Sequence, residues 1–312
     1  MSVRAVTAPQ VAVTAVVCTR NRGAAIAAAL HSLLANMPAQ FELLIVDQST
    51  SDDTQHAVAP FVADPRVRYV RSATVGLGRA RNIGLRLAQT EVVAFTDDDC
   101  EVPPDWLAQM SRSFSEHPRV AVTFCSVTAG PHDVHAGFVP VYRCQGTRVL
   151  RRIGEKPRAR GIGAGMAVRR RAMVELGGFD EELGAGATFP SWEDGDVASR
   201  ALLGGYEVCE TDRTAVVHFG FRSWEEGRRL SRRDWVGIGA GCAKPLRAGR
   251  WRFAAVALYE LCACALWPGI RDVLRFKWPS GLGRAFYFAE GFVRGLGAPF
   301  DRKLLVFRSH TS

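Results

Sequence analysis

The chain has 312 residues, of which 47% are hydrophobic and 23% charged, so it can form a sizeable core and is not disordered over most of its length. The net charge is +9, but residues 221–312 carry 17 basic and 7 acidic side chains, and residues 1–220 are close to neutral. A nucleic-acid partner is therefore a hypothesis for the tail alone, and we expect none, because no recognition motif accompanies the charge.

Apolar runs alternate with helical patterns over the first 130 residues. We expect strands at 11–18, 41–47, 67–70, 91–96 and 120–127, and helices at 23–34, 51–62, 78–89 and 103–117. This βα alternation predicts an α/β fold with a mostly parallel, Rossmann-type sheet flanked by helices. Ligands bind at the carboxyl ends of strands in such sheets, and polar residues stand at three of these ends: Thr19-Arg20-Asn21, Asp47 and Asp97–Asp99.

The rest of the chain is less regular. We expect an irregular segment at 129–161, a Gly-rich strand-like segment at 161–168, helices at 170–176 and 192–203, and a strand at 206–218. Beyond residue 220 the chain reads as a helical extension, with helices at 224–241 and 282–296 and an apolar run at 253–270. We therefore divide it into a body, 1–220, with halves at about 1–127 and 128–220, and a basic extension, 221–312.

Eight cysteines are scattered along the chain, and none forms a CxxC pair. Several lie in apolar runs, where a free cysteine behaves as a small hydrophobic residue. The first residues lack the charged, apolar and cleavage regions of a signal peptide. We therefore expect free thiols and a cytoplasmic protein.

Asp97, Asp98 and Asp99 follow a strand of the buried type. In extended backbone, Asp97 and Asp99 point the same way. Two carboxylates, completed by diphosphate oxygens and water, suit Mg²⁺ or Mn²⁺. A solvated acidic turn that caps the next helix is the alternative interpretation.

Five motifs occur in an order that points to a known family. Together they resemble the nucleotide-sugar-dependent, inverting glycosyltransferases of family 2, which have the GT-A fold, and the resemblance covers about residues 11–220. It implies a GT-A-like body with a helical extension. The motifs are VVCTRNR (16–22), LLIVDQSTSDD (43–53), GLGRARNIG (76–84), the Asp97–Asp99 triplet and WEDGD (192–196).

The resemblance implies a donor site for a UDP- or dTDP-sugar. Thr19, Arg20 and Asn21 would line the nucleotide pocket, and Asp47 would accept a hydrogen bond from the base. Arg79 or Arg81 would approach the base or the diphosphate. Helix capping by Asp47 and a solvated helix face for the arginines are the alternatives.

The resemblance also implies a divalent metal ion, Mn²⁺ or Mg²⁺. Asp99 would be its main ligand, Asp97 and Asp98 would share contacts to ribose and to metal-bound water, and Asp97 would belong to the ligand set. His218 would be a third ligand of the metal or the diphosphate. A purely structural role for His218 is the alternative.

Asp194 matches the general base of the family. An acceptor hydroxyl must lose its proton as it attacks the anomeric carbon, and the first turn of a helix favours an ionised carboxylate. Because the nucleoside diphosphate leaves as an anion, one base and one metal imply a single displacement with inversion. Helix capping is the alternative for Glu193 and Asp194.

The remaining expected contacts are to the sugar and the acceptor. Gly163-Ala164-Gly165 would let the backbone approach the donor sugar, and Trp192 would offer an apolar platform beside Glu193. A Gly-rich turn and a core tryptophan are the alternatives. We expect Asp196 to orient Trp192 or Arg200.

Two other functions are weighed against this one. The segment 76–81 begins like a dinucleotide fingerprint, but its third glycine is replaced by Arg81, and an acidic triplet follows instead of a single carboxylate. A dehydrogenase is therefore excluded. A non-catalytic nucleotide-sugar or glycan-binding protein of the same fold remains the alternative.

The basic extension has two interpretations. It would lie on the anionic inner face of the cell membrane, with 251–270 and the stripe Leu282, Phe286, Ala289, Val293 and Leu296 at the interface. Otherwise it would pack on the body or form a homodimer interface. A membrane-spanning helix is disfavoured by Glu260 within the apolar run. Together with the family resemblance, the first interpretation suggests a glycan or lipid-linked acceptor in polysaccharide or cell-wall assembly.

Overall fold

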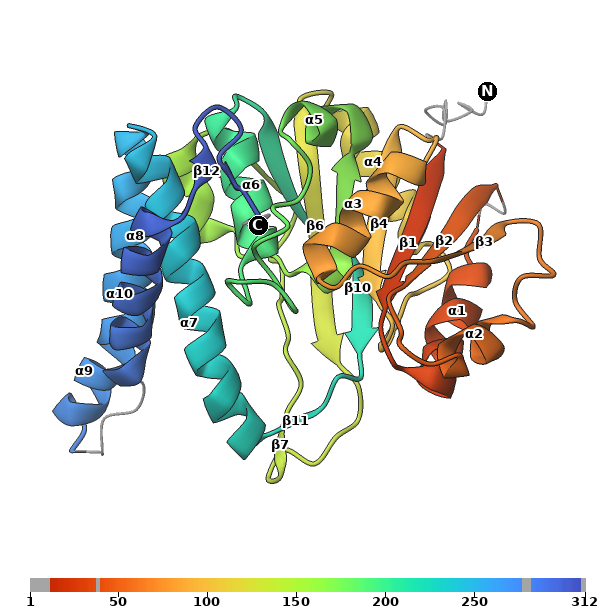
Figure 1. Cartoon of the computed structure of the whole chain (residues 1–312), viewed down its shortest axis with the longest axis horizontal. Coiled ribbons are helices and arrows are strands. Elements are labelled where there is room, and N and C mark those ends of the chain that lie inside the picture. The colour runs from red at the N-terminus through yellow and green to blue at the C-terminus, as the bar shows by residue number, and fades with distance from the viewer. Residues whose placement is uncertain (1–11, 38–39, 277–281, 310–312) are drawn as a thin grey trace, which may run out of the picture.

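The computed structural model describes residues 12–37, 40–276 and 282–309. Within them, a nine-stranded sheet has the order β3-β2-β1-β4-β9-β6-β10-β5, with β8 beside β10 (Figure 1). Its strands are β1 Val13–Thr19, β2 Phe41–Asp47, β3 Val67–Arg71, β4 Val92–Asp97, β5 Cys100–Glu101, β6 Val120–Ala129, β8 Arg148–Leu150, β9 Met166–Arg169 and β10 Glu207–His218.

The sheet is mostly parallel, as expected. Strands β3, β2, β1 and β4 run parallel, as do β6 and β10, whereas β9 lies antiparallel between β4 and β6. Its central strands are rich in valine and other apolar residues and are almost fully buried, because helices cover both of their faces. The predicted α/β fold is therefore confirmed.

Helices cover the two faces of the sheet and create two cores. Helices α1 Ala27–Leu34, α2 Asp53–Val58 and α4 Trp106–Glu116 lie on one face. Helices α3 Leu77–Leu87, α5 Arg170–Glu175 and α6 Glu193–Leu203 lie on the other. The second core continues into the extension, where Trp235, Ile238 and Phe253 join it.

Most predicted elements are present, with shifted ends. Val11 of the first predicted strand lies outside the described residues, and the helix predicted at 51–62 is shorter. The irregular segment contains the short strand β7 Gly137–Phe138, which pairs with β11 Arg222–Ser223, and a helical turn at Ile153–Arg158. All eight cysteines are free, as predicted.

The extension forms a helical layer at one end of the sheet (Figure 1). It consists of α7 Trp224–Arg247, the continuous helical segment η4 Trp251–Phe253, α8 Ala254–Tyr259, η5 Glu260–Leu266 and α9 Trp267–Leu274, and then α10 Leu282–Gly297. The hairpin β12 Phe300–Asp301 and β13 Val306–Phe307 then returns to the body. Of the described helices, one, Trp251–Leu274, is long and apolar enough to cross a membrane.

Glu260, in the middle of that helix, faces the body. Its side chain is buried and forms an ion pair of 2.9 Å with Arg160, whose guanidinium also lies 2.7 Å from Sγ of Cys264. A carboxylate in a lipid-facing position would be costly, and here it has an internal partner. The helix is therefore docked on the body along the face that carries Glu260.

A buried ion network joins the extension to the body. Lys244 of α7 has no exposed side-chain surface and contacts Asp180 and Asp196, with 2.9 Å between Nζ and Oδ1 of Asp196. Arg200 binds the other oxygen of Asp196 at 2.7 Å, which confirms the expected orienting role. Asp180 also accepts a hydrogen bond of 2.8 Å from the backbone N–H of Phe307. One network thus holds α6, α7 and the C-terminal hairpin.

We predict that Lys244→Met destabilises the protein by about 3–5 kcal/mol, because it leaves two carboxylates buried with too few cations. Denaturant unfolding followed by circular dichroism measures this. Arg171→Met is the matched control, because Arg171 forms an exposed ion pair with Glu175 and its loss should cost less than about 1 kcal/mol. Equal stabilities of the two variants would contradict the role of the network.

Candidate active site

The strand pairing brings polar strand ends together. Thr19, at the end of β1, lies opposite Asp47 of β2, and the preceding residue of β1 lies opposite Asp97 of β4. His218, at the end of β10, pairs with Cys100 directly after the three aspartates. Residues far apart in sequence therefore meet where α/β sheets bind ligands.

Asp97, Asp99 and His218 form a cluster with Cys100, and one ligand atom of each lies within 4.8 Å of the others. Nε2 of His218 lies 3.2 Å from Oδ1 of Asp99. The other ring nitrogen, Nδ1, lies 3.1 Å from the carbonyl oxygen of Pro140, which accepts a hydrogen bond from it. A carbonyl partner on the second nitrogen is typical of histidines that ligate metals, so Nε2 is the nitrogen turned to the cluster.

Gly220 leaves a hollow beside these ligand atoms. A Cβ atom at this position would lie 2.5 Å from Nε2 of His218 and 2.9 Å from Oδ2 of Asp99. Gly220 is not among the glycines with positive φ, so its lack of a side chain is what matters. The hollow and the donor set fit a divalent cation.

Cys100 does not fit that role. Burial raises the pKa of its thiol far above the ordinary value, and the charges of Asp97 and Asp99 add to the effect. A thiol that stays protonated is a poor ligand for a hard cation. Asp97, Asp99 and His218 are therefore the candidate ligands.

Asp98 is not part of the cluster and is buried. Burial raises its pKa to about 6, although Thr19 and Arg22 act in the opposite direction. Arg22 bridges two carboxylates, with Nε 3.0 Å from Oδ1 of Asp98 and Nη2 2.8 Å from Oδ2 of Asp99. Asp98 thus positions Arg22 at the edge of the cluster.

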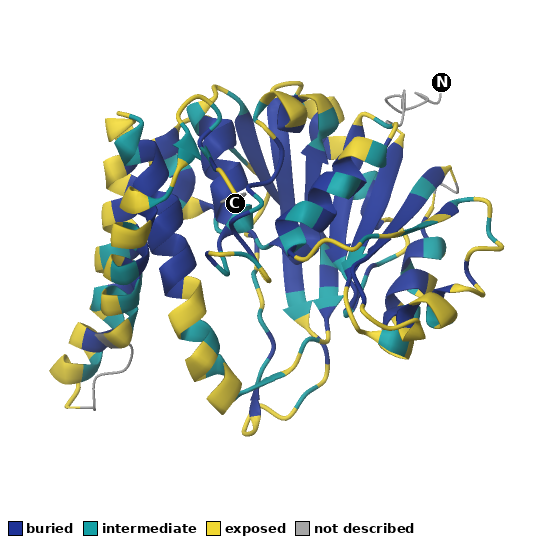
Figure 2. Ribbon diagram, in the orientation of Figure 1, coloured by how far each residue is buried: buried dark blue, intermediate teal, exposed yellow. Residues whose placement is uncertain are grey.

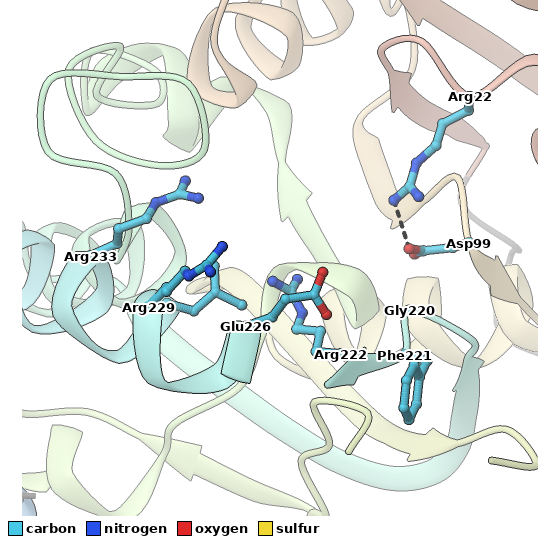
Figure 3. Close-up of a pocket in the computed structure, with 9 residues that line it drawn as sticks. Arg22, Asp99, Gly220, Phe221, Arg222, Glu226, Arg229 and Arg233 are labelled. Carbon is cyan, nitrogen blue, oxygen red and sulfur yellow. Dashed lines mark hydrogen bonds and ion pairs between the residues drawn. The ribbon is translucent and has the colours of Figure 1, made fainter. Parts of the chain in front are cut away.

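Arginines line a cavity of about 410 Å³ beside the cluster (Figure 3). Arg22 and Asp99 lie on one side, and Arg222, Arg229 and Arg233 lie on the other, on β11 and α7. Such a concentration of guanidinium groups suits phosphate oxygens. Sequence reasoning missed Arg222, Arg229 and Arg233, and the only signal for them was the basic character of the chain after residue 220.

A smaller cavity of about 190 Å³ lies at the ends of β1 and β2. Thr19 and Arg20 line it, as the nucleotide-pocket expectation requires, together with Gln48 and Gly76. Gln48 was not predicted, and its Nε2 donates to Oγ1 of Thr74 at 3.0 Å and to the carbonyl oxygen of Gly76 at 3.2 Å. This cavity is the candidate nucleoside pocket.

Asn21 and Asp47 hold the loops around this pocket. Oδ1 of Asn21 accepts from the backbone N–H of Thr50 at 2.9 Å. Asp47 is fully buried, and its two oxygens accept from the backbone N–H of Ser49 at 2.8 Å and from the hydroxyl of Tyr69 at 2.7 Å. Asp47 therefore stabilises the turn at Ser49 and is not among the residues that line the cavity, and it does not cap the next helix, which begins at Asp53.

The two arginines of α3 have different surroundings. Arg81 is buried, lies 3.2 Å from Oε1 of Glu193 and 3.8 Å from Oδ1 of Asp97, and stacks on Phe179. Arg79 instead pairs with Glu182 at 2.8 Å. Of the two arginines, Arg81 thus joins the cluster of candidate metal ligands to the start of α6.

Asp194 lies in the first turn of α6 and is half-buried. Its Oδ2 accepts from the backbone N–H of Gly163 at 3.0 Å, and its Oδ1 accepts from the backbone N–H of Gly195 at 2.6 Å. Burial raises the pKa of Glu193 to about 7, and the charge of Asp194 adds to the effect. Asp194 is thus the oriented, accessible carboxylate of the pair.

Gly163, Gly165 and Trp192 pack internally. A Cβ atom at Gly163 would lie 2.3 Å from Nη2 of Arg81, and one at Gly165 would lie 2.8 Å from Sγ of Cys125. Ala164 between them is buried. Trp192 is buried against Phe253 and Gly241, so the structure shows the core tryptophan of the alternative interpretation and no exposed sugar platform.

The sequence profile described as Glycosyl transferase family 2 matches residues 14–177, just over half of the chain. The chain belongs to this family. The match confirms the resemblance carried by the strand-end motifs, and it ends before the motif that contains Asp194.

Similar proteins include two curated bacterial proteins that are named for different biosynthetic products. The succinoglycan biosynthesis protein ExoO of Rhizobium meliloti is 37% identical over 99 residues, which are 31% of this chain and 28% of ExoO. The beta-monoglucosyldiacylglycerol synthase of Trichormus variabilis is 28% identical over 183 residues, 54% of this chain and 38% of the synthase. The chain thus spans about a third of the length of these curated relatives.

A solved structure shows the same fold. The mannosyltransferase PcManGT from Pyrobaculum calidifontis, in complex with GDP-Man and Mn²⁺, superposes with a TM-score of 0.62 at 21% identity, over 91% of this chain and 86% of that one. This likeness confirms the GT-A-like fold of the glycosyltransferase.

We predict that Gly220→Ala weakens Mn²⁺ binding at least about tenfold, because the new methyl group would occupy the hollow beside His218 and Asp99. Isothermal titration with MnCl₂ measures it. Gly154→Ala is the control, because nothing lies within 4 Å of a Cβ atom there. The site would be placed wrongly if both variants bound Mn²⁺ as the unaltered protein does.

The affinity for Mn²⁺ should also depend on pH. Burial lowers the pKa of His218, but its hydrogen bonds to Asp99 and Pro140 outweigh this effect and raise the pKa above its ordinary value of about 6.5. The proton competes with the metal, so affinity should fall about tenfold per pH unit as the pH drops below that raised pKa. Titrations at several pH values test this, and His218→Gln should reduce the dependence. A flat profile in the unaltered protein would exclude His218 as a ligand.

Proposed function

We propose that this glycosyltransferase moves a sugar from a nucleoside diphosphate sugar to a hydroxyl group of a glycan or lipid-linked acceptor, with inversion of the anomeric centre. One observation carries the proposal. Arg81 lies between Asp97 of the metal-ligand cluster and Glu193, next to Asp194, so a cation site and an oriented carboxylate share one site.

The donor site combines the two cavities. The nucleoside would occupy the smaller cavity at Thr19, Arg20 and Gln48, and the diphosphate would lie toward Asp99. PcManGT was solved with GDP-Man, and GalNAc-T7, another protein of this fold, with UDP. The expected preference for UDP- or dTDP-sugars rested on Asp47, whose oxygens already have partners, so we propose only the nucleoside diphosphate sugar class.

Asp194 would accept the proton of the attacking hydroxyl. The backbone N–H groups of Gly163 and Gly195 orient its carboxylate, which is half-buried and can be reached. Arg22, Arg222 and Arg229 would bind anionic oxygens in the larger cavity. A divalent metal held by Asp97, Asp99 and His218 would neutralise charge on the departing diphosphate.

The acceptor class rests on the relatives and on the chain's own extension. One relative is named for succinoglycan biosynthesis, and another for synthesis of a glucosyl diacylglycerol. Polysaccharide and glycolipid assembly both use hydroxyl acceptors, and both suit the open arginine-lined cavity. We propose that the enzyme transfers the sugar on the cytoplasmic side of a membrane.

We predict that Asp194→Asn lowers sugar transfer about 10²–10⁴-fold, because the amide cannot accept the proton, and leaves donor binding within about twofold. Release of nucleoside diphosphate from a panel of nucleotide sugars, with Mn²⁺ and a membrane lipid extract, measures transfer. Isothermal titration with the same donors measures binding. Asp105→Asn, an exposed change at the start of α4, is the control.

The same experiment separates an enzyme from a binding protein of this fold. Turnover by the unaltered protein that is lost in Asp194→Asn supports the proposal. Donor binding without turnover in either protein would favour the non-catalytic alternative. Turnover that is unchanged by the substitution would exclude Asp194 as the base.

A further inference from the structure

Helix α10 packs on α7 through glycines. A Cβ atom at Gly291 would lie 2.0 Å from the carbonyl oxygen of Val236, and one at Gly239 would lie 2.1 Å from that of Phe288. Four residues after Gly291, a Cβ atom at Gly295 would lie 2.8 Å from Cα of Ala240. Two helices in backbone contact through a GxxxG pair are typical of packing in membranes, where small residues form the interface.

Part of the apolar surface of α10 faces outward, whereas Phe288 is buried in the core. Phe286 and Val293 are 68% and 66% exposed, and Leu296 and Ala289 lie on the same exposed face. These residues form the stripe expected from the sequence, and the side chain of its first member, Leu282, lies outside those described. A helix of a water-soluble layer normally turns its large apolar residues inward. On α10, Phe286, Val293 and Leu296 stay exposed, while the glycines and Phe288 face inward.

The neighbouring helix adds to this apolar face. On α9, Trp267, Ile270, Val273 and Leu274 are exposed, with Leu274 at 67%. Figure 2 shows exposed residues along the outer side of α8, α9 and α10, on the side away from the sheet. Large apolar side chains exposed on two helices of one layer mark an interaction site.

The charges that border this face are mainly positive. Arg250, Arg252, Arg271 and Arg275 are exposed at the two ends of the helix Trp251–Leu274. The acidic residues of the helix Trp251–Leu274 and of α10 lie near arginines or are half-buried. Glu260 pairs with Arg160, Glu290 lies near Arg232 and Arg294, and Asp272 is half-buried. An apolar face with arginines at its border complements an anionic lipid surface.

We propose that the outer face of α9 and α10 docks on the surface of an anionic lipid bilayer, with Leu274, Phe286 and Val293 inserted among the acyl chains. The helix Trp251–Leu274 lies in the interface and does not span, because Glu260 holds its inner face to the body through Arg160. The inference does not depend on the proposed reaction, since it rests on the packing and charge of the extension alone.

Sedimentation of the full chain with vesicles tests the proposal. Vesicles of phosphatidylglycerol and phosphatidylcholine should bind the protein, and vesicles of phosphatidylcholine alone should bind it less. The triple variant Leu274→Glu, Phe286→Glu, Val293→Glu should lower partitioning at least about a hundredfold, because three charges replace inserted apolar groups. The control Met37→Glu, Val62→Glu, Val174→Glu changes three exposed apolar residues of the body and should shift partitioning less than about twofold.

Three results would overturn the proposal. The first is that the protein does not sediment with anionic vesicles, and the second is that the two triple variants bind equally. The third is that high salt releases the protein completely while the apolar substitutions have no effect. A stable dimer that the first triple variant dissociates, without vesicle binding, would assign the face to a second copy of the chain.

A second measurement does not require charged substitutions. Brominated phospholipids should quench the fluorescence of the unaltered protein on binding, and quench it less in Trp267→Phe, because Trp267 is half-exposed on α9. Trp224→Phe, a half-exposed tryptophan at the start of α7, is the control. Equal loss of quenching in both variants would contradict docking through α9.

Discussion

Lys244 is the buried cation around which two parts of the chain are assembled. Its ammonium group has no exposed surface and is compensated by Asp180 and Asp196, and Asp196 is shared with Arg200. Buried charges are tolerated only with such partners, so α6, α7 and the loop at Asp180 must come together as a set. Because α6 begins at the Glu193-Asp194 pair, the same network fixes the end of the helix that carries the proposed base.

The active site depends on a second buried cation. Arg81 lies between carboxylates from two elements, and the absence of a side chain at Gly163 makes room for it. The segment that carries Gly163 then donates its backbone N–H to Asp194. The proposed metal site and the proposed base therefore depend on one another, because a substitution of Arg81 would alter the surroundings of both.

The sequence could predict the features that depend on residues close together in the chain, which are the strands, their connections and the aspartates at their ends. Valine-rich runs, their connections and the aspartates at their ends predicted the parallel sheet and placed Asp97 and Asp99 at its edge, whereas Asp194 was assigned through the family resemblance alone. Gly220 and the arginines of α7 could not be predicted, because their positions depend on how β10 and β11 pair with distant strands. The roles of Trp192 and Gly163 also depend on tertiary packing, since a tryptophan platform and a core tryptophan look alike in sequence.

Helix α7 connects the arginine-lined cavity, the outer helix α10 and the buried network at Lys244. Its first turns carry arginines of the open cavity, its middle touches the backbone of α10, and its last turns hold Lys244. Backbone contact at Gly239 leaves no flexible side chains to absorb a displacement. A displacement of α10 would therefore displace α7 as well. Through α7, a displacement of α10 would change the position of the arginines that line the cavity beside Asp99.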